Sequence, residues 1–247
     1  MIKEITSINN SLIKETLNIL KDKKSKYFIV ESKHLLQMAL QSDLVIRVFA
    51  LEKLDIDDSI EQIIINKKIM DKLSNLKNSS DVICVCKKKD EFIKNDNLLI
   101  YLDYIQDPGN LGTIIRSGLA FGIKNFLLSK NCVSIYNFKT IMASQGAIFD
   151  INFKTILDTN ELKEYKKTYT FLGFALSDDY KNFNEFSFNK NENYMLIFGN
   201  EGNGISKDVL NICDHKLIIP IKNIDSLNVA ICFSIVAYLL NIKYLNH

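Results

Sequence analysis

The second half of the chain consists of short, almost continuous apolar runs that alternate with helical patterns. Strands that are apolar at nearly every position need cover on both faces of their sheet, as in buried parallel sheets. The pattern therefore predicts an α/β fold with a parallel sheet, closed by an apolar helix over 229–244. The expected strands are Leu98–Asp103, Asn125–Ser129, Ala147–Phe153, Tyr169–Ala175, Tyr194–Phe198 and Lys216–Ile221.

The first half has the same alternation on a smaller scale. β-branched runs at 28–30, 45–51, 62–66 and 82–86 are separated by helical patterns at Ser11–Leu20, Lys33–Leu40 and Ile69–Leu76. A polar stretch over 87–97, which contains no glycine or proline, then interrupts the pattern. We therefore predict two domains, a small α/β domain at 1–94 and a larger one at 95–247.

Composition excludes several classes of protein. The net charge of +2 is almost neutral, so any binding of a polyanion must come from local patches. Five cysteines without a Cys-x-x-Cys pair and three scattered histidines indicate neither a disulfide framework nor a metal site, and Cys84 and Cys86 are expected to pack in the core. No apolar run reaches the ~18 residues of a membrane span, and no secretory leader is evident. We expect a reduced, soluble, cytoplasmic protein without a membrane partner.

Seven of the nine glycines cluster after two of the expected strands, where an open parallel sheet forms its ligand crevice. The first cluster belongs to the segment Asp107-Pro-Gly-Asn-Leu-Gly-Thr-Ile-Ile-Arg116. Pro108 and Gly109 are expected to form a turn, with a helix starting near Asn110. Arg116 is one of two arginines in a chain with 31 basic residues, and its planar fork suits a phosphate or an oxyanion. Asn110 and Arg116 would share one face only if the first helical turn were irregular.

The second cluster is the turn Phe198-Gly-Asn-Glu-Gly-Asn-Gly204, which follows a strand. Glycines expose backbone amides, which favours a phosphate cradle. However, Glu201 would repel a pyrophosphate, and the Gly-x-Gly-x-x-Gly spacing is absent. Open amides beside a carboxylate better suit a neutral or cationic ligand, such as an adenosyl group that carries a sulfonium.

A third polar segment, Pro220 to Asn228, lies between the last strand and the terminal helix. Pro220 closes the strand. Ser226 and Asn228 open the helix, and Ser226 is a suitable N-cap. Capping alone does not explain why the apolar Leu227 stands between these two polar residues.

Together, the three segments resemble motifs 1, 2 and 3 of the SpoU or TrmH branch of the SPOUT superfamily, over about residues 98–244. The resemblance implies an RNA ribose 2′-O-methyltransferase that uses S-adenosyl-L-methionine, with a C-terminal trefoil knot in its SPOUT domain. The segments Ile5–Asn10 and Phe28–Glu31 are similar to the N-terminal, L30e-like RNA substrate-binding domain that often accompanies it.

The resemblance also implies roles for particular residues. The catalytic group would be Asn110, Arg116, Glu201, Ser226 and Asn228. The cofactor would contact Gly199, Asn200, Gly204, Ile219 and Leu227. Two roles stay open for Arg116: it could act as the general base, or it could hold a phosphate and stabilise a developing alkoxide, since a guanidinium rarely loses its proton.

Two departures from the family pattern stand out. The loop Ile221–Asp225 lacks the glycine common in motif 3 and looks short, so the knot could grip the cofactor differently. In the N-terminal domain, Ser32 replaces the usual glycine after Glu31, and Lys26 stands where arginine is common. Specificity for RNA could therefore have diverged.

The resemblance implies two partners, RNA and a second copy of the chain bound through the C-terminal domain. The apolar terminal helix could serve as the face of such a dimer or simply pack in the core. The separate N-terminal domain favours 23S rRNA over tRNA. Lys23, Lys24 and Lys26 are candidate contacts with the RNA backbone, although an ordinary solvated loop would look the same. Two other functions compete: a SPOUT-fold module that binds RNA without methylating it, and a nucleotide-dependent oxidoreductase, which the missing dinucleotide fingerprint disfavours.

Overall fold

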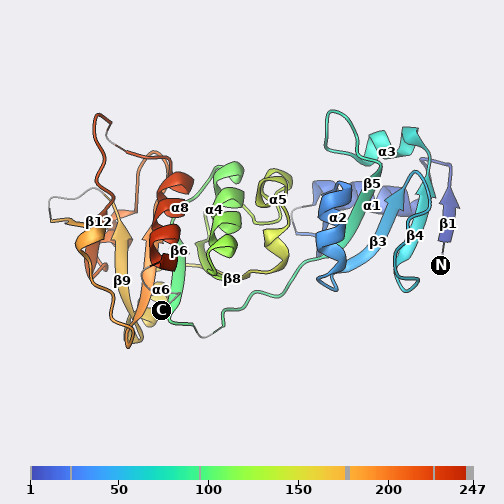
Figure 1. Ribbon diagram of the computed structural model, residues 1–247. Coiled ribbons are helices and arrows are strands. Elements are labelled where there is room, and N and C mark those ends of the chain that lie inside the picture. The colour runs from blue at the N-terminus through green and yellow to red at the C-terminus, as the bar shows by residue number, and fades with distance from the viewer. Residues whose placement is uncertain (1, 23, 95, 176–178, 225, 243–247) are drawn as a thin grey trace. The chain divides into compact units, whose positions relative to one another are not determined.

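The computed structural model describes residues 2–22, 24–94, 96–175, 179–224 and 226–242 (Figure 1). The chain forms two compact units, Met1–Asp90 and Glu91–His247. This division falls close to the boundary between residues 94 and 95 that the sequence predicts.

The first unit is a five-stranded mixed sheet with the strand order β1-β4-β3-β5-β2. Its strands are β1 (Ile2–Ile5), β2 (Tyr27–Glu31), β3 (Val45–Ala50), β4 (Glu61–Ile65) and β5 (Val82–Lys87). Its helices are α1 (Ser11–Lys21), α2 (Lys33–Leu40) and α3 (Lys67–Leu73). The sequence did not predict β1, because only Ile5 of this strand is buried and the apolar pattern is therefore weak.

Alternation along β5 distributes its side chains between the two faces of this sheet. Ile83 and Val85 join an apolar cluster with residues of α1 and α3. Cys84 and Cys86 are directed to the opposite face and are equally buried, which confirms their expected place in the core.

The second unit contains a seven-stranded sheet in which every pairing is parallel, with the order β10-β12-β9-β11-β6-β7-β8. This confirms the predicted parallel α/β fold. The strands are β6 (Leu98–Leu102), β7 (Asn125–Ser129), β8 (Asn152–Ile156), β9 (Tyr169–Phe174), β10 (Lys181–Asn182), β11 (Asn193–Phe198) and β12 (His215–Ile218). The helices are α4 (Pro108–Ala120), α5 (Phe138–Ser144), α6 (Thr159–Glu164), α7 (Lys207–Leu210) and α8 (Val229–Leu240).

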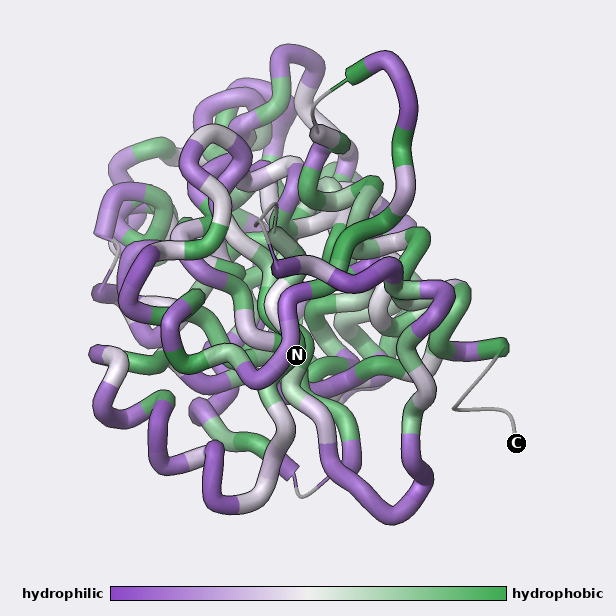
Figure 2. Tube along the Cα trace, turned by 90° about the vertical axis from the view of Figure 1, so that its left-hand side faces the viewer, coloured by the Kyte–Doolittle hydropathy of each residue, from purple (hydrophilic) through white to green (hydrophobic). Residues whose placement is uncertain are grey.

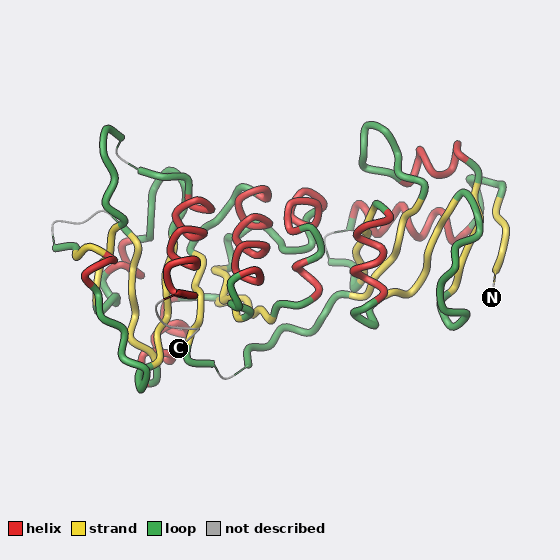
Figure 3. The backbone as a smooth tube through the Cα atoms, in the orientation of Figure 1, coloured by secondary structure: helices red, strands yellow, loops and turns green. Residues whose placement is uncertain are grey.

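Helices cover both faces of this sheet. One face packs against α6 and α7, through Leu162 and Val209. On the other face, α4 lies between α8 and α5 (Figures 1 and 3). Phe126 of β7 and Phe198 of β11 both contact Phe233 of α8, with ring centroids 6.3 and 5.2 Å apart. The trefoil knot stays a prediction.

Three predicted elements differ from the structure. Ala147–Phe149 is a 3-10 helix, and the strand begins only at Asn152. The 3-10 helix is fully buried and continues directly into Ile151 and Phe153, which are also buried, so the apolar run alone could not distinguish the two pieces. The strand expected to reach Ile221 ends at Ile218, and α8 ends at Leu240; residues 243 and 244 lie outside the described ranges.

Along the trace, hydrophilic residues lie mostly in the outer loops (Figure 2). None of the helices in the described ranges is long and apolar enough to cross a membrane. Likewise, the described side chains include no group of three or more His, Cys, Asp or Glu that could hold a metal ion.

Candidate active site

The site lies where the order of the strands reverses. The chain proceeds from β6 to β7 and β8 on one side, whereas β11, β9 and β12 lie on the other. Leu102 and Phe198 are paired at the carboxyl ends of β6 and β11, and the Asp103 amide donates to the Phe198 carbonyl at 2.8 Å. The segments that follow β6 and β11 leave the sheet in different directions from this point, which creates the crevice that open parallel sheets use for ligands.

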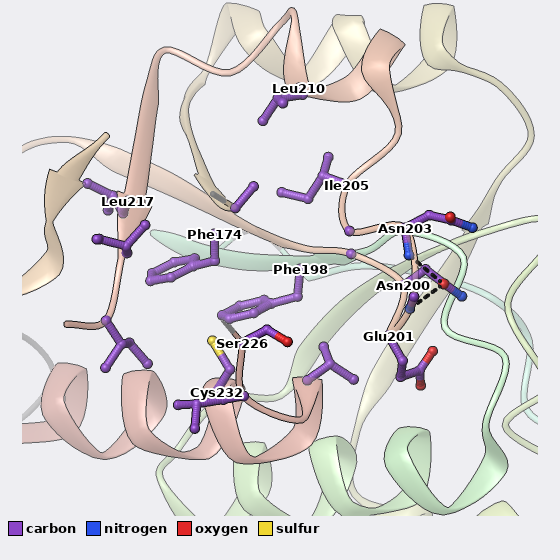
Figure 4. A pocket seen from close by; sticks show the side chains of 18 of the residues that line it. Phe174, Phe198, Asn200, Glu201, Asn203, Ile205, Leu210, Leu217, Ser226 and Cys232 are labelled. Atoms are coloured by element: carbon purple, nitrogen blue, oxygen red, sulfur yellow. Dashed lines mark hydrogen bonds between the residues drawn. The ribbon is translucent and has the colours of Figure 1, made fainter. Parts of the chain in front are cut away.

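A cavity of about 440 Å³ opens beside this point, at the carboxyl ends of β9, β11 and β12. At its centre the rings of Phe174 and Phe198 stack, with centroids 4.7 Å apart and planes 4° from parallel (Figure 4). Most other lining groups are aliphatic or belong to the glycine turn. The lining includes all five residues predicted to bind the cofactor, together with Glu201 and Ser226: Gly199, Asn200, Glu201, Gly204, Ile219, Ser226 and Leu227.

The glycine turn closes tightly on itself. A Cβ atom on Gly199 would lie 2.1 Å from the Gly204 carbonyl carbon and from the Ile205 amide nitrogen, so only glycine fits there. Asn200 and Gly204 exchange two backbone hydrogen bonds of 2.9 Å, and Gly204 has a φ of 68°. The turn is therefore a rigid wall of the cavity.

The backbone amides of this turn are not open, contrary to the expectation from the sequence. The Asn200 Oδ1 atom accepts hydrogen bonds from the amides of Gly202 and Asn203, at 2.8 and 3.2 Å, and the Gly204 amide donates to the Asn200 carbonyl. Asn200 Nδ2 also donates to the Tyr104 carbonyl at 2.9 Å. Asn200 therefore organises the turn, which leaves little room for a phosphate cradle.

Side chains of the three motifs meet at Asn110. Its Nδ2 atom donates to Glu201 Oε1 at 2.7 Å, and its Oδ1 atom accepts from Asn228 Nδ2 at 3.0 Å. These bonds join residues 91 and 118 positions apart in the chain. The structure thus brings three of the five predicted catalytic residues into one polar cluster, with Ser226 on the wall of the neighbouring cavity.

The helix caps differ from those predicted. Helix α4 begins at Pro108, and Asp107 caps it by accepting from the Asn110 amide at 2.8 Å. Pro108 and Gly109 therefore belong to the first helical turn, because proline suits the first helical position. Asn228, not Ser226, caps α8, through bonds from the amides of Ala230 and Ile231. Ser226 is free of this role and lies next to Phe198 (Figure 4).

The structure does not bring Arg116 to this cluster. Because Asn110 is helical, Arg116 lies about 120° around α4 from it and roughly 9 Å further along the axis. Arg116 is exposed and does not line the cavity, and its guanidinium forms no hydrogen bond or ion pair with the residues described. The irregular first turn that would have aligned the two side chains is absent from α4.

The sequence did not indicate two further residues of the site. Asp103 is 1% exposed, and its Oδ2 atom accepts from the Ser206 amide at 2.8 Å, which ties the end of β6 to the segment after the glycine turn. In the sequence, the only indication of a role for Asp103 is that it is an acidic residue at the end of an apolar strand. Cys232 lines the cavity, and burial raises the pKa of its thiol to about 11. The thiol is therefore protonated at neutral pH and is a weak nucleophile.

The lysines predicted to contact RNA belong to the loop between α1 and β2. Lys24 and Lys26 are exposed, and Lys23 lies outside the described residues. The Lys24 amide donates to Asp22 Oδ1 at 2.8 Å, which shapes this loop.

A parallel sheet with an apolar cavity and a polar cluster at its switch point defines an α/β protein that binds a small ligand. The SpoU rRNA Methylase family matches residues 97–238, more than half of the chain, and the chain belongs to this family. The resemblance found in the three motifs is thereby confirmed.

Individual relatives extend this similarity to nearly the full length. The chain is 29% identical to the 23S rRNA (guanosine(2553)-2'-O)-methyltransferase RlmP of Bacillus subtilis, over 96% of this chain and 98% of that protein. It is 25% identical to a 23S rRNA (uridine(2479)-2'-O)-methyltransferase of Streptomyces viridochromogenes, over 59% of this chain and 53% of that protein. The fold matches the AdoMet-bound rRNA methyltransferase of Sinorhizobium meliloti with a TM-score of 0.83 and 21% identity, over 96% of both chains.

Proposed function

We propose that this protein transfers a methyl group from S-adenosyl-L-methionine to a ribose 2′-OH of ribosomal RNA, and that 23S rRNA, not tRNA, is the substrate. The observation that carries this proposal is the cluster of Glu201, Asn110 and Asn228 beside an apolar cavity. Membership of the SpoU family and the similarity to two 23S rRNA methyltransferases support it.

The cavity suits S-adenosyl-L-methionine, which supplies an activated methyl group on a sulfonium. Its volume lies within the usual range of small-molecule sites, and its apolar walls, including Ile219 and Leu227, suit an adenine ring. Glu201 adds a carboxylate, which favours a cationic ligand over a pyrophosphate. In Figure 4, Glu201 lies with Asn200 and Asn203 at one end of the cavity, while Leu217 lies at the other.

The polar cluster would orient the ribose. Asn110 is held by Glu201 on one side and by Asn228 on the other, so its amide group has one fixed orientation. A hydroxyl that enters this cluster would meet groups already in position, and positioning lowers the barrier to an in-line displacement. We assign Asn110, Glu201, Ser226 and Asn228 to this task.

Arg116 would contact the RNA from the flank of α4. Its guanidinium is exposed and has no partner among the described residues, which suits bidentate binding of a phosphate next to the reacting ribose, where it would also stabilise negative charge. A guanidinium rarely loses its proton, which favours this role over that of a general base.

The partners follow from the same proposal. The first unit would serve as an L30e-like domain that binds RNA, and Lys23, Lys24 and Lys26 would contact the RNA backbone. Ile231 and Tyr238 are each 51% exposed and lie seven residues apart on α8, which leaves one apolar face of this helix uncovered. This face supports a homodimer formed through the C-terminal unit. Such an enzyme would act in the cytoplasm, where ribosomal RNA is modified.

The proposal is tested by methyl transfer. Purified protein is incubated with methyl-labelled S-adenosyl-L-methionine and unmodified transcripts of 23S rRNA, 16S rRNA or tRNA. We expect label in 23S rRNA, released after alkaline hydrolysis as a dinucleotide, because a 2′-O-methyl group blocks cleavage at that linkage. The variant Asn110→Ala serves as the control that retains the cavity but lacks the centre of the cluster.

A different result would favour the second candidate function. If the protein binds 23S rRNA but labels none of the three RNAs, it is an RNA-binding module on a methyltransferase fold. If the label appears in tRNA alone, the choice of substrate is wrong but the reaction stands.

A further inference from the structure

Tyr104 has a backbone conformation that tyrosine rarely adopts. Its φ of 60° lies in the left-handed region, where bulky side chains are strained and glycine or asparagine is preferred. It follows Asp103 at the carboxyl end of β6, beside the candidate active site. Its side chain is 42% exposed, so packing in the core does not compensate for the strain.

The backbone of Tyr104 is fixed from both sides. Its amide donates to Ser129 Oγ at 2.9 Å, and its carbonyl accepts from Asn200 Nδ2 at 2.9 Å. Asn200 is the residue that organises the glycine turn, and it precedes Glu201 in the polar cluster. The conformation of Tyr104 is therefore imposed by the site, and it places an aromatic ring on the outside of that site. Strain of this kind is typical of functional positions.

An exposed cation lies on the neighbouring segment. The loop after β7 is joined to the segment around Tyr104, because the Val133 amide donates to the Ile105 carbonyl at 2.8 Å. Within this loop Lys130 is exposed and forms no ion pair with any described residue. A ring and a free cation on adjacent loops are the two groups that hold single-stranded RNA, by stacking on a base and by binding a phosphate.

We propose that Tyr104 stacks on a base of the RNA close to the methylated nucleotide, and that Lys130 binds the backbone beside it. This inference rests on the proposed function and names residues that would position its substrate. Tyr104 would act on the RNA and not on S-adenosyl-L-methionine, since it does not line the cavity.

The first test compares two substitutions with opposite consequences for the ring. Tyr104→Asn removes the ring but suits a positive φ, so the melting temperature should not fall. Because the stacked base would lose its partner, the KM of Tyr104→Asn for 23S rRNA should rise roughly tenfold, with the affinity for S-adenosyl-L-methionine unchanged. Tyr104→Phe keeps the ring and should recover most of this loss. An unchanged KM in Tyr104→Asn would overturn the proposal.

The second test does not depend on methyl transfer. The chain contains no tryptophan, so Tyr104→Trp introduces a single indole at the position in question, whose emission can be excited separately from that of the tyrosines. Stacking on a base should quench its emission when 23S rRNA is added. Tyr180→Trp is the matched control, because Tyr180 is 49% exposed in the same unit. Absence of quenching at 104, or equal quenching at 180, would contradict the proposal.

The two tests separate this inference from the proposed function. If the wild-type protein methylates no RNA, the proposed function fails, while quenching at position 104 still decides whether Tyr104 stacks on RNA. If methylation occurs without quenching, the function stands and the role of Tyr104 is refuted.

Discussion

The two sides of the candidate site differ in how completely their polar groups are satisfied. On the side of the cavity, the amides of Asn200, Gly202, Asn203 and Gly204 in the glycine turn all donate hydrogen bonds within the turn, and Asn110 is held by two partners. On the outer side, Lys130 and the ring of Tyr104 are exposed, as is Arg116 further along α4, and neither cation pairs with a described residue. The first side is organised before any ligand binds, whereas the groups on the second side obtain binding partners only when a ligand is present.

This difference matches the two substrates proposed for the enzyme. A small cofactor gains affinity from a pocket that does not have to reorganise. RNA supplies its own charges and bases, which would pair with groups left free on the protein. Arg47, the other arginine, differs from Arg116 because its guanidinium already has carboxylate partners. It bonds Glu61 at 2.6 Å and lies 3.7 Å from Glu15, both in the first unit.

The largest effect is expected from a change on the organised side. Gly199→Ala would place a methyl group 2.1 Å from backbone atoms of the same turn, so the turn must open. We expect loss of S-adenosyl-L-methionine binding in calorimetry and a fall in activity of at least about 100-fold, by analogy with other losses of preorganised groups. Gly202→Ala is the matched control, since its added Cβ would meet only Asn200 Oδ1, at 3.5 Å. Equal cofactor affinity in the two variants would show that the turn is not rigid.

Substitutions at Arg116 test whether the exposed groups of the outer side act on the RNA. Arg116→Ala should reduce the rate of methyl transfer by about 10²–10³, with cofactor affinity and melting temperature unchanged, because the guanidinium has no partner among the described residues. Arg116→Lys should retain measurable activity with a flat pH profile if the residue only stabilises charge. Complete loss in Arg116→Lys, with the cofactor still bound, would instead favour a role as general base. Lys139→Ala, an exposed cation on α5, provides the comparison for a nonspecific effect of charge.

The sequence located the polar cluster and part of the cavity wall, but not the aromatic centre of the cavity. Asn110, Glu201 and Asn228 were assigned to one site from three separated motifs, and hydrogen bonds join them in the structure. The stacked pair of Phe174 and Phe198 was not predicted, because both read as ordinary residues of apolar strands. The motif residues can be recognised in the sequence because they are polar residues or glycines that interrupt an apolar pattern. Phe174 and Phe198 follow that pattern, so their role in lining the cavity is evident only when the fold brings their strands together.

The paired arginine should affect stability alone. The pKa of Glu61 is lowered by hydrogen bonds from Lys3 and from Arg47. Because its pKa is lowered in the folded protein, the Glu61 carboxylate stabilises the fold at pH values above its ordinary pKa of 4.5. This stabilisation is lost as the pH falls through the pKa that Glu61 has in the folded state. Arg47→Ala should therefore reduce the free energy of unfolding by about 1 kcal/mol at neutral pH, since the pair is partly exposed. In denaturant titrations this difference should shrink below about pH 4.5, and methyl transfer at neutral pH should not change.

The smallest effect is expected in the first unit, at the loop between α1 and β2. Lys24 and Lys26 are exposed, and each phosphate contact that is lost lowers the slope of log affinity against log salt by about 0.7–0.9. Replacing both lysines by alanine should weaken binding of 23S rRNA only a few-fold at physiological salt, but by more at low salt. Lys53→Ala, at another exposed lysine of this unit, controls for the change in total charge. If the slope in Lys24→Ala/Lys26→Ala equals that of the wild type, these lysines do not contact the RNA backbone, and this loop is an ordinary solvated surface.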